Sequence, residues 1–370
     1  MTTTTFTLDD LIELIQPDLQ VLADGRRRMA DLFHDRATDS LPILFSTPAP
    51  EEGIAWNKDL RLHVEDPDQM LYDQVAGLIG WARAGSDAQL SIRADTGTGT
   101  LCTAAGCGQL LSEFGLPWTT HIGREAIEAF DPADIAEKGV MPRVYELYAY
   151  FRARLPERIH FYIADTQSPF DLAHLLYGDA IFYDMFDDPE FVHLLLDKAT
   201  ALYANGSKLM KEWIGEAADG GYHNGGLWMA NGGVRACEDT ATLLSPDLID
   251  EYVVPYRDQG VAPFGGGWVH YCGNNDALYA TVLKAPQVRG LNFGNPERHD
   301  FSRVLPELIE AGKFYFGNPP REEDEALEAY FRRVIGYTGG AKKGLILVPE
   351  LRGDESKEPA RVIDLWRSLQ

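Results

Sequence analysis

Short apolar segments recur along the chain, and most of them end in Gly, Pro, Asp or Asn. Apolar runs of this length, bounded by turn-forming residues, are typical of β-strands. We expect eight strands, at residues 41–46, 90–95, 159–165, 226–231, 268–272, 288–293, 313–317 and 345–349.

Amphipathic stretches separate these segments. Apolar residues three and four positions apart predict helices at residues 67–84, 131–155, 189–214, 247–262, 274–284, 301–311, 322–338 and 359–369. Strands that alternate with helices favour a parallel sheet, and eight such units favour an α/β fold closed into a (β/α)8 TIM barrel. Residues 8–33 also have a helical pattern. We therefore expect an N-terminal helical segment at 1–40, packed on a barrel at 41–370.

Such a barrel places its chemistry at the carboxyl ends of the strands, so polar residues there are candidates for the site. They come from seven of the expected strands and would meet on one rim. The candidates are Asp95, Asp165, Asn231, His270, Cys272, Asn292, Asn318 and Glu350.

Composition narrows the possible partners. The formal net charge of −24 disfavours nucleic acids and anionic membranes, because phosphate binding needs clustered Lys and Arg. Four cysteines in 370 residues do not make a disulfide scaffold. Residues 1–10 lack a basic stretch followed by an apolar run, and no segment is long enough to span a membrane. We expect a cytoplasmic protein.

Several motifs, in order along the chain, resemble the uroporphyrinogen decarboxylase superfamily. Residues 165–173 (DTQSPFDLA) are similar to its D-x-Q-G-P-F-x-L-A segment, and 238–256 contain its E-D, L-S-P and P-Y elements. Residues 270–274 (HYCGN) resemble the H-x-C-G-N motif of the zinc-dependent methyltransferase branch. The resemblance implies a uroporphyrinogen decarboxylase-like barrel with one of two chemistries: metal-free decarboxylation, or methyl transfer with a corrinoid protein.

The segment after the first strand argues against true uroporphyrinogen decarboxylation. The decarboxylases resemble one another in an R-Q-A-G-R motif there, whose arginines bind a substrate with many carboxylates. Residues 46–52 (STPAPEE) have no arginine and two glutamates, which would repel such a substrate. Asp95 does lie where the decarboxylases keep their catalytic aspartate.

A zinc site is expected at the end of the fifth strand. Residues two apart on a strand point the same way, so His270 and Cys272 can bind one cation. Zinc accepts imidazole and thiolate ligands, and catalytic sites use three protein ligands and an open position. The related enzymes have a cysteine after the eighth strand, where this chain has Glu350. Glu350 is the predicted third ligand, with Cys237 and Cys107 as alternatives. A carboxylate ligand would favour polarising an oxygen substrate such as a methyl ether.

The remaining candidates line the substrate pocket. Asp95, Asp165, Gln167 and Asn231 are predicted to contact the substrate, although Asp165 could instead cap the following helix. Arg235 is expected to face the mouth and to pair with a substrate carboxylate or with Glu238. His223 precedes the expected fourth strand, so it is predicted to be structural, at the opposite end.

The sequence is compatible with three alternative functions. The first is a zinc-dependent methyltransferase that moves a methyl group between a small molecule and a corrinoid (cobalamin) carried by a partner protein. The second is a metal-free decarboxylase or lyase in which Asp95 is essential. The third is a non-catalytic binding protein that has lost the metal.

Overall fold

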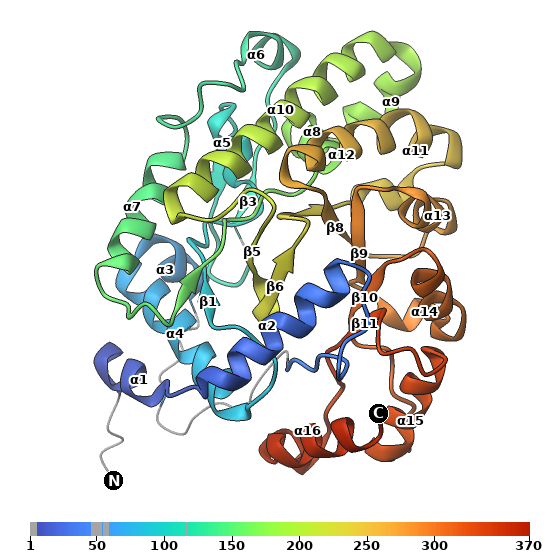
Figure 1. Cartoon of the computed structure of the whole chain (residues 1–370). Coiled ribbons are helices and arrows are strands. Elements are labelled where there is room, and N and C mark those ends of the chain that lie inside the picture. The colour runs from blue at the N-terminus through green and yellow to red at the C-terminus, as the bar shows by residue number, and fades with distance from the viewer. Residues whose placement is uncertain (1–5, 46–53, 55–58, 116) are drawn as a thin grey trace.

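Parallel strands form the centre of the molecule and helices surround them (Figure 1). This computed structural model describes residues 6–45, 54, 59–115 and 117–370. The strands are β1 (Ser91–Ile92), β2 (Gln109–Leu110), β3 (Trp118–Thr119), β4 (His160–Phe161), β5 (Gly220–His223), β6 (Leu227–Ala230), β7 (Val234–Cys237), β8 (Gly267–Tyr271), β9 (Val288–Phe293), β10 (Phe314–Gly317) and β11 (Leu345–Leu347).

The predicted helices at 67–84 and 189–214 match α4 and α10 at both ends. In α10 the Asp188 carboxylate accepts a hydrogen bond from the Phe191 N–H, and the helix ends at Gly215, whose φ is +79°. The helices are α1 (Leu8–Leu14), α2 (Leu19–Phe33), α3 (Leu60–Glu65), α4 (Pro67–Ala84), α5 (Thr100–Ala104), α6 (Arg124–Ala129), α7 (Met141–Arg152), α8 (Pro169–Tyr177), α9 (Ala180–Asp187), α10 (Pro189–Ile214), α11 (Pro246–Tyr252), α12 (Val254–Val261), α13 (Asp276–Lys284), α14 (Phe301–Glu310), α15 (Leu327–Tyr337) and α16 (Pro359–Ser368). None of the helices in the described ranges is long and apolar enough to cross a membrane.

The main sheet is parallel, with five strands in the order β11-β10-β9-β8-β7. Ile43 extends it by a parallel bridge to Leu347, and β1 and β4 form a separate parallel pair. Helices connect these strands, which confirms the predicted parallel α/β architecture. Residues 46–52, where the arginines of the decarboxylases are missing, lie outside the described residues.

The strand predicted at 226–231 as a member of the parallel sheet is wrong. Its residues form β6, which pairs antiparallel with β5. Gly225 and Gly226 make the turn between them with φ of +74° and +76°, values that glycine adopts without steric cost. The parallel strand is instead β7, which pairs with β8 and brings Cys237 opposite His270.

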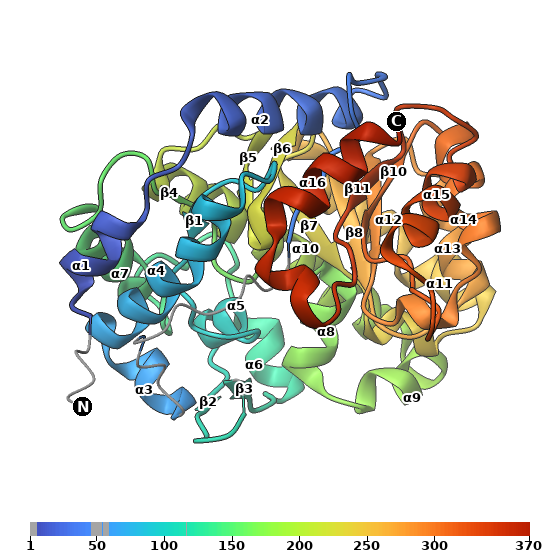
Figure 2. The same cartoon turned by 90° about the horizontal axis from the view of Figure 1, so that it is seen from below.

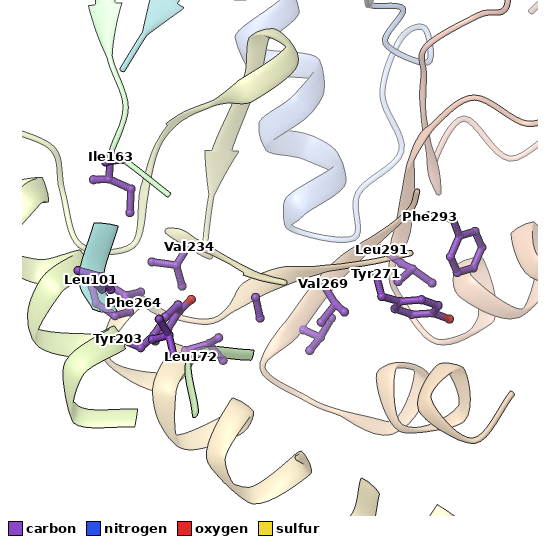
Figure 3. Packing of buried hydrophobic residues seen from close by; sticks show 14 of the residues in the cluster. Leu101, Ile163, Leu172, Tyr203, Val234, Phe264, Val269, Tyr271, Leu291 and Phe293 are labelled. Carbon is purple, nitrogen blue, oxygen red and sulfur yellow. The ribbon is translucent and has the colours of Figure 1, made fainter. Parts of the chain in front are cut away.

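The two faces of the main sheet are covered differently. Successive side chains of a strand point to opposite faces, so Val269 and Tyr271 pack with Leu291 and Phe293 against the surrounding helices (Figure 3). Trp268 and His270 point to the other face, which we call the inner face. It carries a second apolar group, the inner cluster: Met29, Leu32, Phe33, Leu44, Ala88, Leu227, Met229, Trp268, Phe314, Phe316 and Ile346.

Helix α2 covers the amino ends of the strands. It supplies three members of the inner cluster, and β6 supplies two more. Figure 2 shows α2 along one end of the strands, while α9 and the β2–β3 hairpin lie at the opposite end. Because α2 covers the amino ends, we expect a site at the carboxyl ends of the strands.

Candidate metal centre

Side chains that could bind a metal meet at the carboxyl ends of β7 and β8. One ligand atom each from Cys237, Asp239 and His270 lies within 4.8 Å of the other two. Cys272 Sγ lies 3.8 Å from His270 Nε2. We call these four residues the metal-competent group.

The separations among Cys237, Asp239 and His270 are close to those of a tetrahedral zinc site. Cys237 Sγ lies 3.5 Å from Asp239 Oδ2, and His270 Nε2 lies 3.8 Å from Asp239 Oδ1. Zinc bonds of about 2.0 to 2.3 Å place neighbouring ligand atoms roughly 3 to 4 Å apart. Imidazole, thiolate and carboxylate are all ligands that zinc accepts.

A hydrogen-bond chain fixes the orientation of His270. Asn292 Nδ2 donates to the Phe316 carbonyl at 2.5 Å, which leaves Asn292 Oδ1 to face His270 Nδ1, also at 2.5 Å. An amide oxygen can only accept, so Nδ1 carries the proton and Nε2 keeps its lone pair. This is the arrangement of a histidine ligand whose second nitrogen is held by a neighbour.

Asp171 positions the loop that carries Asp239. Its buried carboxylate accepts hydrogen bonds from the Asp239 and Thr240 N–H groups at 2.9 and 3.1 Å. Burial and the nearby Asp239 carboxylate raise the Asp171 pKa well above its usual value. Asp239 Oδ1 in turn accepts from the Cys272 N–H at 2.5 Å, which ties the two strand ends together.

Gly294 leaves room for the Cys272 thiol. A Cβ at this position would lie 2.3 Å from Cys272 Sγ, well inside van der Waals contact. The backbone N–H of Gly294 donates to the Tyr271 carbonyl at 2.9 Å, so the two segments run close together. A glycine is therefore required for the thiol to occupy its place beside His270.

Protonation in the metal-competent group is set mainly by burial. Burial lowers the pKa of His270, with a further contribution from the Arg235 guanidinium, so the imidazole is neutral and able to bind a metal at neutral pH. Burial raises the pKa of Cys272 to about 11 and that of Cys237 well above its usual value. A metal would have to displace the thiol protons as it binds.

Glu350, the predicted third ligand, is engaged elsewhere. Its Oε1 accepts from Arg352 at 2.8 and 3.1 Å, and its Oε2 accepts from the Arg321 N–H at 3.3 Å. It lines a separate cavity of about 320 Å³, together with Asn318. Among the described residues, Asp239 and not Glu350 supplies the carboxylate near His270. Of the alternatives, Cys237 belongs to the group, while Cys107 lies beside the buried Cys102.

Three of the four predicted pocket residues lie together on the inner face. Asp165 accepts from Arg235 at 2.9 Å and from the Gln167 side chain at 2.5 Å. Arg93 joins it to Asp95, with contacts of 3.5 Å to Asp165 and 2.8 Å to Asp95. Asp165 does not cap α8, whose N-cap is Ser168.

Asn231 lies at the other end of the sheet. It precedes β7, its side-chain amide donates to the Phe33 carbonyl at 3.5 Å, and its own carbonyl accepts from Arg289 at 2.6 Å. The prediction that placed it at the carboxyl ends depended on the wrong fourth strand. Arg235 pairs with Asp165 and not with Glu238, which pairs with Arg257 at 3.6 Å, while its pairing with a substrate carboxylate stays a prediction.

His223, predicted as a structural residue at the opposite end, packs against side chains of the inner face. It is buried on the inner face, with its ring 5.1 Å from Trp268 and 5.6 Å from Tyr162. Its Nδ1 and the Trp268 Nε1 are buried without a hydrogen-bond partner in the described part of the chain. The turn Asn224-Gly225-Gly226 was the available signal, since it marks a hairpin that folds His223 back into the molecule.

Comparison with known proteins shows a shared fold. The chain is similar to a solved methyltransferase from Methanosarcina mazei, with a TM-score of 0.64 and 16% sequence identity over 92% of this chain and 98% of that one. At this level of identity the similarity concerns the fold. No family model matches the chain, and no curated protein matches it.

Proposed function

We propose that this protein is a zinc-dependent methyltransferase that moves a methyl group between a small substrate, such as a methyl ether, and a corrinoid carried by a separate protein. The observation that carries the proposal is the metal-competent group at the ends of β7 and β8. The order of the superfamily motifs and the shared fold with a methyltransferase support it.

The proposal includes a uroporphyrinogen decarboxylase-like (β/α)8 barrel. Eight parallel segments are available: Ile43, β1, β4 and β7 to β11. Two backbone hydrogen bonds of flanking residues support closure, from the Asp87 N–H, ahead of β1, to the Ile43 carbonyl at 3.0 Å and from the Cys237 N–H to the carbonyl of Gln167, after β4, at 3.3 Å. The inner face would then be the barrel interior, with the segment 1–40 packed on its amino end.

In this function His270 and Cys272 hold zinc with Asp239 or Cys237 as the third ligand in place of Glu350, and the fourth position stays open for a substrate. Bound zinc would supply Lewis acidity, either toward a thiol or toward an ether oxygen. Asn292 keeps the His270 Nε2 lone pair free, and Asp171 holds Asp239 in position. Asp95, Asp165 and Gln167 border the space in which the substrate would lie.

Metal analysis tests the proposal. Protein purified without chelator should contain about one zinc per chain, and the double variant His270→Ala, Cys272→Ala should contain almost none. Cys102→Ala is the matched control, because it removes a buried thiol outside the metal-competent group and should keep its zinc.

Methyl transfer is measured separately. With a corrinoid protein and candidate methyl donors, the cobalt absorption spectrum should change with wild-type protein and stay constant with the double variant. A zinc-free wild-type protein whose activity depends only on Asp95 would contradict the proposal and favour the metal-free lyase.

A further inference from the structure

Two guanidinium groups meet on the inner face, beside the metal-competent group. Arg235 lies two residues before Cys237 on β7, so both side chains point to the same face. Arg235 Nη2 and Arg93 Nη1 contact the same oxygen of Asp165, Oδ2, at 2.9 and 3.5 Å. An arginine of β7 and one that directly follows β1 therefore converge on one point.

Both guanidinium groups keep unused donors. A guanidinium has five N–H donors, yet in the described residues the Arg235 side chain makes one hydrogen bond, to Asp165, and that of Arg93 makes one, to Asp95. The side chains are 16% and 18% exposed, so part of each remains accessible. Largely buried cationic donors bind an acceptor strongly when one arrives.

The carboxylate oxygens of Asp165, which lies between the two arginines, are already used. Asp165 Oδ1 accepts from the backbone and the side chain of Gln167 at 3.1 and 2.5 Å, and Oδ2 faces the two arginines. A cationic ligand would find these lone pairs taken, whereas an anionic ligand would find free donors. The arrangement therefore selects for negative charge in the ligand.

Aromatic rings lie next to these donors. The Arg93 guanidinium lies 5.9 Å from the centre of the Tyr162 ring, which neighbours His223, and His223 neighbours Trp268. Such rings offer an apolar surface to the body of a small ligand. His270 follows Trp268 by two residues on the same face, so a ligand held by the arginines would lie beside the metal-competent group.

We propose that the substrate carries a carboxylate, which Arg235 and Arg93 bind, so that the rest of the molecule reaches the metal-competent group. This inference rests on the proposed function and specifies its substrate class. It makes Arg235 a specificity-determining residue that recognises charge.

Calorimetric titration tests the inference with two probes of nearly equal shape, para-methoxybenzoate and para-methoxybenzamide. Wild-type protein should bind the acid at least about tenfold more tightly than the amide, as expected for charge-assisted hydrogen bonds to a carboxylate. The titration is repeated on protein freed of metal by a chelator. The preference should persist there, because the arginines and not the metal provide it.

The variant Arg235→Gln with Asp165→Asn removes both members of the ion pair, so no buried charge is left without a partner. It should lose most of the preference for the acid, because only Arg93 is left to bind the carboxylate. The matched control is Arg303→Gln with Asp276→Asn, a more exposed pair at 2.8 Å, which should keep the wild-type preference. Arg93→Gln should reduce the preference less than the Arg235 variant, because Arg93 also pairs with Asp95.

The outcomes separate this inference from the proposed function. Equal binding of the two probes by wild-type protein, no binding of either, or an unchanged preference in the Arg235 variant would each overturn the inference, even in a protein with zinc and methyl transfer. A clear preference in a chain that contains no zinc would support the inference and count against zinc-dependent methyl transfer.

Discussion

The inner face has two ends with opposite chemistry, although the same strands build both. At the amino ends, Phe33, Phe314 and their neighbours form an apolar cluster that α2 covers. At the carboxyl ends, Arg235, Asp165 and His270 form a polar layer. On β8, Trp268 belongs to the first and His270 to the second, only two residues or roughly 6.6 Å further along. Stability and chemistry can therefore be changed separately, one end at a time.

The largest expected effect comes from the apolar end. Phe33 is 2% exposed and its ring centre lies 4.7 Å from that of Phe314. Phe33→Ala removes a buried ring and leaves a cavity, so the free energy of unfolding should fall by about 3 to 5 kcal/mol. Urea or thermal unfolding followed by circular dichroism measures this change.

If the two ends of the inner face are independent, Phe33→Ala should leave the polar end intact. The folded variant should bind zinc in the wild-type ratio. The exposed control Phe114→Ala, at a residue that is 85% exposed, should change stability by less than about 0.5 kcal/mol. A Phe33 variant that is fully stable but loses zinc would show that the two ends are not separate.

A smaller effect is expected at the polar end. Asn292→Ala removes the acceptor that holds the proton on His270 Nδ1. Loss of a neighbour that orients a metal ligand lowers metal affinity by about 10- to 100-fold. Competition with a chromophoric zinc chelator measures the affinity. An Asn292→Asp variant, which keeps an acceptor toward His270, should retain more of the affinity than the alanine variant, and the reverse order would refute the role assigned to Asn292.

Features that depend on residues within one helix or strand could be predicted from the sequence, whereas contacts between distant segments could not. The helical spacing at 67–84 and 189–214 predicted α4 and α10 at both ends, because caps and amphipathic faces are local features. Residues 227–230 (LWMA) are all apolar, whereas β7 (VRAC) contains an arginine, so the pattern favours the wrong segment as the parallel strand. Which of the two joins the main sheet depends on pairing with β8, a contact that spacing alone does not encode.

The same limit explains which residues of the candidate site could be predicted from the sequence. His270 and Cys272 were found because alternation along a strand places them together. Asp239 was missed because its place depends on hydrogen bonds to Asp171, 68 residues earlier in the chain. The partner of Arg235 was left open for the same reason, since Asp165 lies 70 residues away. These contacts could not be predicted because the residues are far apart in the chain, not because the interactions between them are weak.

The smallest expected effect tests a charge at the apolar end. Lys313 is buried just before β10, where its Nζ donates to the Ala285 and Val288 carbonyls at 2.7 Å. Burial lowers the Lys313 pKa to about 8, against about 10.4 in an unfolded chain. Between these two values the unfolded chain binds the proton and the folded chain does not. Stability from this residue should therefore rise as pH rises from about 8 to about 10.

Lys313→Met removes this titration, so the comparison of the two proteins isolates it. The free energy of unfolding of wild-type protein minus that of the variant should grow by about 2 kcal/mol between pH 8 and pH 10. Below pH 8 the lysine is charged in both states, so the difference should be constant there. Urea unfolding at a series of pH values measures both ranges. Parallel curves across the whole range would mean that Lys313 stays charged in the folded protein, because the two carbonyls compensate for its burial, and the apolar end would then tolerate charge as the polar end does.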